Sequence, residues 1–298
     1  MSQGSSRGRA ELAIVGITIV WGSTFVLVKS ALADVSTFLF IALRFSLAAL
    51  VLALVYRRSL KRNGLWPGLA AGCLLFVAYV FQTKGLELTT PAKSAFLTGL
   101  SIPMVPLLGS LVYRNRPRMF EAAGILVATA GMGLMTLPSG GFGIGRGDVL
   151  SVLCAVAFAL HIVLVSHYTP LIGFETVAVA QVAGAAALGL LSFRFAEPVR
   201  FHMNGAVATA VLVTGLLATA VAFTTLAWAQ QYTTATRSAL IFALEPVVAW
   251  VTSYLLTGDT LNGRGKAGAA LILAGVLMVE LKPNKLAAET NVSEGTSL

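Results

Sequence analysis

The stretch TTPAKSAFLTGLSIP, at Thr89–Pro103, returns later in the chain as TTATRSALIFALEP, at Thr233–Pro246. The copies begin 144 residues apart, and each holds a Thr-Thr pair, a basic residue followed by serine, and a closing proline. The closing prolines lie 143 residues apart, so one residue has slipped between these anchors. The chain therefore contains an internal repeat, because the offset of 144 also pairs Gly124 with Gly268, Ala130 with Ala274, Gly131 with Gly275 and Leu137 with Leu281.

The composition around this repeat excludes a soluble protein. Apolar residues make up 57% of the 298 residues, charged residues 11%, and the mean hydropathy is +0.84. Soluble domains carry about 25% charged residues, which supply much of their wetted surface. A membrane-spanning helix needs about 20 apolar residues. Because the apolar runs are continuous, they also exclude an outer-membrane barrel. Ten runs qualify: 11–31, 36–56, 66–86, 92–113, 119–137, 147–168, 174–194, 205–230, 235–256 and 263–281.

The repeat divides these runs into two sets of five. Since five is odd, the second set must cross the membrane in the opposite sense, as in transporters whose substrate site lies near the bilayer midplane between inverted repeats. We expect an all-α integral membrane protein, with ten transmembrane helices as two inverted five-helix repeats around a central cavity. The predicted parts are a cytoplasmic head at 1–10, a first repeat at 11–137, a linker at 138–146, a second repeat at 147–281 and a polar cytoplasmic tail at 282–298.

Positive charges predict the orientation. With the N-terminus inside, the cytoplasmic segments of the first half hold nine Lys and Arg residues and its opposite side holds four, although the second half does not repeat this bias. We therefore place both termini in the cytoplasm of a bacterial-type inner membrane. The net charge of +9 is accounted for by topology and contact with the lipid bilayer, which leaves no case for a nucleic-acid partner.

The sequence also carries a family resemblance. The two five-helix halves, the WGSTFVLVK run at Trp21–Lys29, the Arg44-Phe45 pair and the LEPVVAW run at Leu244–Trp250 resemble the EamA family of the drug/metabolite transporter superfamily. Within it, the chain is most similar to bacterial exporters of aromatic amino acids of the YddG type. The resemblance implies a ten-helix basket with a central cavity and an amino-acid substrate. The first half departs from the Glu-Pro pattern by carrying Ile102-Pro103.

Glu245 is the one carboxylate predicted near mid-membrane, where burying an ionisable group costs roughly 2.5–3.5 kcal/mol or more. One hypothesis gives it proton coupling or substrate contact. The other makes it a structural residue bonded to neighbouring hydroxyls, such as those of Ser238 or Thr252, or to a cation of the second half.

Helical spacing gathers further polar and aromatic residues on the faces of several helices. Such a lining suits an amphipathic solute with an apolar side chain and a zwitterionic head, while helix–helix hydrogen bonding is the competing explanation. The predicted cavity residues are Trp21, Thr24, Tyr79, Gln82, Ser94, Thr98, Ser101, Phe158, His161, Thr224, Trp228, Ser238, Phe242 and Glu245.

Prolines mark the helices that we expect to bend during transport. Pro103 and Pro106 in the fourth run and Pro246 in the ninth interrupt helices at comparable places in the two halves, which is typical of a transporter site. Arg44 is expected to be architectural or gating.

Other functions fit the sequence less well. No paired carboxylates, nucleophile with a base, metal spacing or P-loop is present, so we expect neither an enzyme nor a cofactor. The prediction is a transporter that exports aromatic or hydrophobic amino acids, or similar small metabolites, by alternating access. A translocator of a lipid or lipid precursor and a passive metabolite channel stay open. Small residues such as Gly268 and Gly275 could pack within the chain or against a second copy.

Overall fold

The computed structural model describes residues 3–89, 91–113, 118–136, 145–258, 260 and 262–280. These residues form helices and connecting segments, with one antiparallel bridge between Val35 and Phe201. The elements are α1 (Gln3–Ala31), α2 (Thr37–Tyr56), η1 (Arg62–Gly64), α3 (Leu65–Leu88), α4 (Pro91–Gly99), α5 (Ser101–Tyr113), α6 (Met119–Thr136), α7 (Arg146–Ile172), α8 (Phe174–Ser192), α9 (Gly205–Gly215), η2 (Leu216–Val221), α10 (Ala222–Ala229), α11 (Ala235–Phe242), α12 (Glu245–Thr257) and α13 (Gly263–Glu280).

Each of the ten apolar runs contains helix. Within the described residues, eight spans are long and apolar enough to cross a membrane, and α6 is a shorter apolar helix. Large apolar side chains remain on the outside of the bundle, such as Leu111, Leu191 and Leu255 at 77%, 69% and 75% exposure. An outer surface of this kind is suited to lipid. The chain is therefore a multi-pass, all-helical membrane protein.

The helices depart from the predicted boundaries in several places. Helix α1 begins at Gln3, so most of the predicted head at 1–10 forms its first turns. Helix α7 continues through Pro170 to Ile172. The predicted linker at 138–146 lies outside the described residues except at its last two positions, and the tail at 282–298 lies wholly outside them.

Two of the predicted spans are broken helices. The run at 92–113 divides at Leu100 into α4 and α5, and the run at 235–256 divides at Ala243 and Leu244 into α11 and α12. Proline lacks a backbone N–H, and the first turn of a helix is where that donor has no intrahelical acceptor. Pro103 and Pro246 each lie in the first turn after a break, so both helices restart there.

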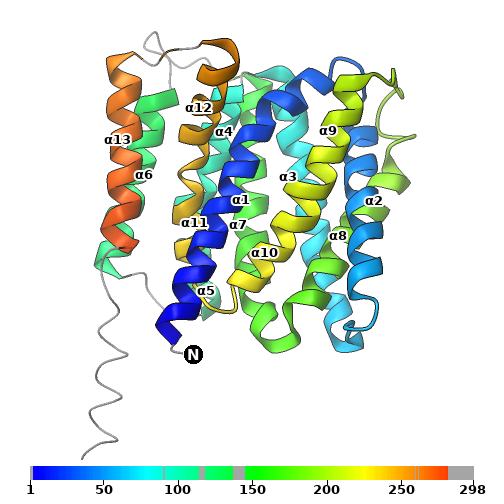
Figure 1. The fold of residues 1–298 in the computed structure, drawn as a ribbon, viewed down its shortest axis with the longest axis horizontal. Coiled ribbons are helices and arrows are strands. Elements are labelled where there is room, and N and C mark those ends of the chain that lie inside the picture. Colours follow the sequence, from blue (N-terminus) through cyan, green and yellow to red (C-terminus); the bar gives the residue numbers. More distant parts are fainter. Residues whose placement is uncertain are drawn as a thin grey trace, which may run out of the picture.

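The helices pack as an interleaved bundle (Figure 1). Helix α3 lies against α7 and α8, α2 against α8, and α1 against α9, α10 and α12. Helices α6 and α13 stand side by side at one edge (Figure 1).

Glycines allow α6 and α13 to approach closely. A Cβ atom added at Gly124 would lie 2.8 Å from the carbonyl oxygen of Gly275, and one added at Gly131 would lie 2.7 Å from that of Gly268. Because the earlier glycine of α6 meets the later one of α13, the two helices run antiparallel. The small face of α13 is therefore occupied within the chain.

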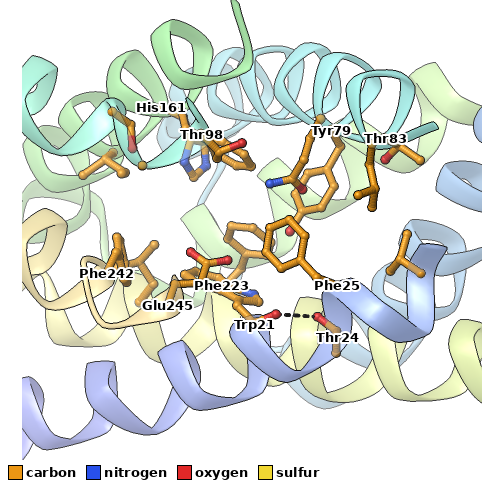
Figure 2. A pocket seen from close by; sticks show the side chains of 18 of the residues that line it. Trp21, Thr24, Phe25, Tyr79, Thr83, Thr98, His161, Phe223, Phe242 and Glu245 are labelled. Atoms are coloured by element: carbon orange, nitrogen blue, oxygen red, sulfur yellow. Dashed lines mark hydrogen bonds between the residues drawn. The ribbon is translucent and has the colours of Figure 1, made fainter. Parts of the chain in front are cut away.

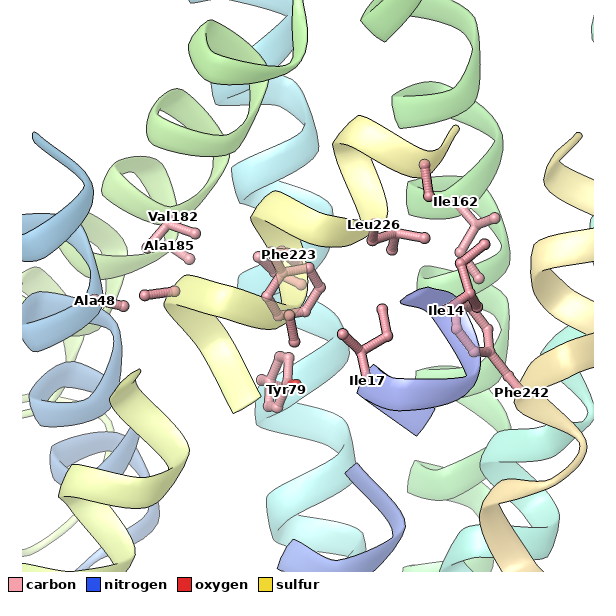
Figure 3. Packing of buried hydrophobic residues seen from close by; sticks show 14 of the residues in the cluster. Ile14, Ile17, Ala48, Tyr79, Ile162, Val182, Ala185, Phe223, Leu226 and Phe242 are labelled. Atoms are coloured by element: carbon pink, nitrogen blue, oxygen red, sulfur yellow. The ribbon is translucent and has the colours of Figure 1, made fainter. Parts of the chain in front are cut away.

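The main apolar core contains side chains from α1, α2, α3, α7, α8, α10 and α11 (Figure 3). Ile14 and Ile17 of α1 meet Phe223 and Leu226 of α10 there, and Phe242 of α11 packs at its edge.

Candidate functional site

A cavity lies among α1, α2, α3, α4, α5, α7, α10, α11 and α12, so both broken helices border it (Figure 2). Its wall combines aromatic, aliphatic, hydroxyl and charged side chains, as small-molecule sites do. The lining residues are Trp21, Thr24, Phe25, Val28, Arg44, Tyr79, Gln82, Thr83, Leu86, Thr98, Gly99, Ser101, Ile102, Phe158, His161, Ile162, Phe223, Leu226, Phe242 and Glu245.

Most of the predicted cavity residues meet at this one cavity. Arg44, which the sequence analysis assigned to architecture or gating, also lies in the wall. The predicted residues in the wall are Trp21, Thr24, Tyr79, Gln82, Thr98, Ser101, Phe158, His161, Phe242 and Glu245.

Four predicted residues lie away from this wall. The buried Ser94 hydroxyl is 3.5 Å from that of Ser151 on α7, so it joins two helices. The Trp228 ring packs on Tyr232, with their centroids 5.4 Å apart. The hydroxyls of Thr224 and Ser238 are buried without a hydrogen-bond partner in the described part of the chain. Pro103 and Pro246 lie in the first turn after the helix breaks, whereas α5 continues through Pro106, so Pro106 does not interrupt it as predicted. None of the three lines the cavity.

The sequence analysis missed Phe223, which is central to the aromatic wall. Its ring centroid lies 5.4 Å from that of Trp21, 6.2 Å from that of Tyr79 and 5.8 Å from that of His161. Helical spacing had pointed to the neighbouring Thr224. The π-helical segment η2 directly precedes α10 and rotates it, so periodicity alone does not predict which residue faces inward.

The aromatic wall continues on both sides of Phe223. The Trp21 ring lies edge-on to Phe242 at 5.2 Å, and the Tyr79 ring lies edge-on to Phe158 at 5.4 Å. Edge-to-face pairs at these separations contribute about 0.5–1.5 kcal/mol beyond burial. The Trp21 indole also donates a 2.8 Å hydrogen bond to the carbonyl of Ala218 in η2, which fixes the ring.

Arg44 is a buried cation held by neutral groups. Its Nε donates to the Thr219 hydroxyl at 3.0 Å, and its Nη2 reaches the Ala218 carbonyl at 3.4 Å and the Tyr79 hydroxyl at 3.5 Å. The guanidinium carbon lies 4.4 Å from the centroid of the Tyr79 ring, a cation–π distance. Within the described residues it has no carboxylate partner.

Glu245 opens α12 at the helix break. Figure 2 shows it beside Phe242 and Trp21, with Tyr79 and Thr83 toward the other end of the cavity. Neither hydroxyl suggested by the structural hypothesis binds it, since Ser238 is unpartnered and Thr252 lies 3.3 Å from Ser23. Gly22 of α1 packs on the first turn of α12, where an added Cβ would lie 2.8 Å from the Glu245 carbonyl oxygen.

His161 brings a buried polar group to the cavity. Its Nε2 lies 2.7 Å from Oε1 of Gln181 on α8, while its Nδ1 and the Gln181 Nε2 have no partner in the described part of the chain. The sequence indicated His161 from its helix face, whereas nothing in the sequence pairs it with Gln181.

Comparison with known proteins identifies the family. A model of the EamA-like transporter family matches the chain twice, over residues 8–137 and 145–281. The chain belongs to the EamA-like transporter family.

Proteins named as uncharacterized transporters are similar over almost the full length. The chain is 33% identical over 283 residues to an uncharacterized transporter of Archaeoglobus fulgidus, covering 94% of this chain and 89% of that one. It is 27% identical over 288 residues to the uncharacterized transporter YyaM of Bacillus subtilis, with 89% and 91% coverage. A solved crystal structure superposes with a TM-score of 0.77 at 24% identity, covering 92% of this chain and 97% of that one. That likeness shows the fold, and together with the family it makes the protein a membrane transporter rather than an enzyme.

This EamA-like transporter carries an ionic cluster at the end of the bundle where α1 begins. Glu11 accepts from Arg7 at 2.7 Å, from Thr233 at 3.3 Å and from Arg237 at 3.4 Å. Arg237 also lies 3.8 Å from Glu121 of α6. The cluster therefore ties α1 and α6 to the start of α11.

The opposite end of the transporter has its own polar network. Lys84 of α3 pairs with Glu87 at 2.9 Å and with Glu197 of the segment after α8. Lys29 donates to the carbonyl of Glu87 at 3.2 Å. Near them, Asp148 of α7 accepts from Thr89 at 3.3 Å.

Proposed function

We propose that this transporter exports amino acids with aromatic or hydrophobic side chains, or similar small metabolites, across the inner membrane by alternating access. The observation that carries the proposal is the composition of the cavity wall. Trp21, Phe223 and Phe242 offer apolar surface for a side chain, and Arg44 and Glu245 offer one charge of each sign for a zwitterionic head. The likeness to YddG-type exporters of aromatic amino acids favours the same substrate class.

Crossed contacts between α6 and α13 support two inverted repeats. The offset of 144 makes Gly124 equivalent to Gly268 and Gly131 equivalent to Gly275. The contacts join Gly124 to Gly275 and Gly131 to Gly268. Gly124 thus contacts the equivalent of Gly131, and Gly131 contacts the equivalent of Gly124. A two-fold axis that relates two equivalent halves produces this crossed pairing.

The ends of the bundle support the same relation. Glu11 of the first half contacts Thr233 of the second, while Asp148 of the second half contacts Thr89 of the first. Thr89 and Thr233 are equivalent at the repeat offset of 144, and Glu11 pairs with Asp148 at an offset of 137 when the first helix of each half is aligned. The helix breaks at Leu100 and at Ala243–Leu244 also correspond. Two matched contacts at opposite ends are what a carrier needs to close either end in turn.

Topology completes the proposal. With both termini in the cytoplasm, the cluster around Glu11 and Arg237 lies at the cytoplasmic end, and the network around Lys84 and Asp148 lies at the outer end. Pro103, Pro106 and Pro246 are the hinges by which the broken helices bend between the two open states. Whether two copies associate stays a prediction of the sequence.

Uptake of labelled amino acids into proteoliposomes that hold the purified protein tests the proposal. We expect saturable uptake of labelled phenylalanine, tryptophan or leucine, and a comparison with and without a pH gradient measures coupling to protons. Absence of flux for every aromatic and aliphatic amino acid would contradict the proposed substrate. Scrambling of fluorescent lipids in the same vesicles would favour a lipid translocator instead.

A further inference from the structure

We infer that Arg44 and Glu245 are the two charge-recognising groups of the cavity: Arg44 binds the carboxylate and Glu245 the ammonium of an α-amino acid, whose side chain lies on the aromatic rings of the wall. This inference rests on the proposed function and deepens it. The inference requires a ligand that carries both an unmodified carboxylate and an unmodified ammonium. An amphipathic metabolite that lacks either group does not meet this requirement.

The guanidinium of Arg44 retains hydrogen-bonding capacity. Its bonds to Thr219, Ala218 and Tyr79 use Nε and Nη2 and leave Nη1 without an acceptor in the described residues. Arg44 lines the cavity although only 4% of its surface is exposed. A planar guanidinium matches the geometry of a carboxylate, and its charge is strongest as a recognition group where water is excluded.

The carboxylate of Glu245 also lacks a partner. Neither a hydrogen bond nor an ion pair reaches it from the described residues, although it lies at the cavity wall. Of the two hydroxyls suggested by sequence, Thr252 bonds Ser23, and Ser238 has no hydrogen-bond partner in the described residues. A buried carboxylate without a partner is costly, and a ligand ammonium would remove that cost.

Arg44 and Glu245 do not neutralise each other, since they form no ion pair in the structure. The Trp21 indole links the two residues: it donates to the same Ala218 carbonyl as Arg44, and its ring lies edge-on to Phe242, three residues before Glu245. Two opposite charges in the wall of one aromatic cavity match a zwitterionic head group that lies between them, with its apolar side chain on the rings. A binding site of this kind ends with every buried charge paired, whereas an anionic lipid head group would leave Glu245 unpaired.

A ligand series tests the inference in proteoliposomes. Competition against counterflow of labelled L-phenylalanine is measured for L-phenylalanine, for 2-phenylethylamine, which lacks the carboxylate, and for 3-phenylpropionate, which lacks the ammonium. In the wild-type protein we expect each analogue to compete about tenfold more weakly or worse, which corresponds to about 1.4 kcal/mol.

Two variants then test which residue binds the carboxylate and which binds the ammonium. Glu245→Gln is expected to weaken binding of phenylalanine and 2-phenylethylamine by about tenfold or more while sparing 3-phenylpropionate. Arg44→Gln is expected to spare 2-phenylethylamine and weaken the two carboxylates. Glu175→Gln and Arg58→Gln, which remove charges away from the cavity, serve as matched controls.

The outcomes separate the inference from the proposed function. Equal weakening of all three ligands in both variants would overturn the inference, because it would assign Arg44 and Glu245 to structure, and the proposed function would stand. Failure of the wild-type protein to carry any amino acid would overturn both. If Arg44→Gln does not fold, Arg44→Lys, which keeps the charge but loses the planar fork, is expected to weaken both carboxylates, and the wild-type ligand series still decides.

Discussion

Trp21 illustrates how single residues build this site. Its indole N–H bonds the Ala218 carbonyl at 2.8 Å, and its ring contacts Phe223 and Phe242. One side chain therefore joins α1 to η2, α10 and α11 at the cavity wall.

Two substitutions separate the roles of Trp21. Trp21→Phe removes the hydrogen bond and keeps an aromatic surface, so we expect a loss of about 1 kcal/mol in stability and a modest rise in the KM for phenylalanine. Trp21→Ala removes the ring as well and should cost about 3–5 kcal/mol. Thermal unfolding in detergent and transport kinetics measure both effects. Equal effects of the two substitutions would show that the ring contacts contribute little.

Residue-level reasoning reached much of the site. Trp21, His161 and Glu245 were indicated because polar and aromatic residues inside apolar runs are rare and share helix faces. Phe223 was missed because regular helical spacing pointed to Thr224, whereas the π-helical segment η2 rotates α10. The pairing of His161 with Gln181 depends on how α7 and α8 cross, which no local pattern records.

At the scale of elements, the glycine contact between α6 and α13 makes a prediction. A Cβ at Gly131 would meet backbone atoms of Gly268 and Ile272 at 2.7 and 2.8 Å, and backbone cannot rotate away. Gly131→Ala should therefore destabilise the protein by about 1–3 kcal/mol while leaving substrate affinity unchanged.

Gly16 provides the matched control for this substitution. It also lies within a helix, but an added Cβ meets nothing within 4 Å. Gly16→Ala should be neutral or stabilising by up to about 1 kcal/mol, since alanine favours helix. Thermal unfolding compares the two variants. A Gly131→Ala variant as stable as Gly16→Ala would contradict the close approach of α6 and α13.

The ionic cluster between α1 and α11 makes a second prediction at this scale. If Glu11 and Arg237 hold one end of the bundle closed, Glu11→Arg or Arg237→Glu alone should reduce the rate of transport several-fold through charge repulsion. The exchanged double variant should recover much of it, because pair energies of this kind are measured by double-mutant cycles. Counterflow rates measure the three variants. A double variant no better than the worse single one would show that the pair does not act as a unit.

The sequence predicted the helices and their breaks, but it did not predict the π-helical segment η2. The presence of helix in each of the ten apolar runs followed from their continuity, and the two breaks followed from Pro103 and Pro246. The π-helical segment η2 was not predicted, because the Thr219 hydroxyl bond to the Thr214 carbonyl and the extra residue per turn depend on packing against α1 and α2. The fold was therefore more accessible from sequence than the rotation of α10 that places Phe223 at the cavity.

At the scale of the whole molecule, the few charged residues lie in two kinds of place: at the ends of the bundle and in the cavity. Only 11% of residues are charged, and the ion pairs described here lie at the two ends of the bundle. Arg44 and Glu245 are exceptions that line the cavity. The proposed carrier requires a bundle of this kind, with a charge-bearing cavity and matched polar contacts at both ends.

Counterflow is the measurement that tests this account most directly. Proteoliposomes are preloaded with unlabelled phenylalanine and diluted into labelled phenylalanine, with empty vesicles and unloaded proteoliposomes as controls. An alternating-access carrier of amino acids predicts saturable uptake that the internal substrate accelerates. Uptake that does not saturate and does not respond to internal phenylalanine would contradict the account and identify a passive channel.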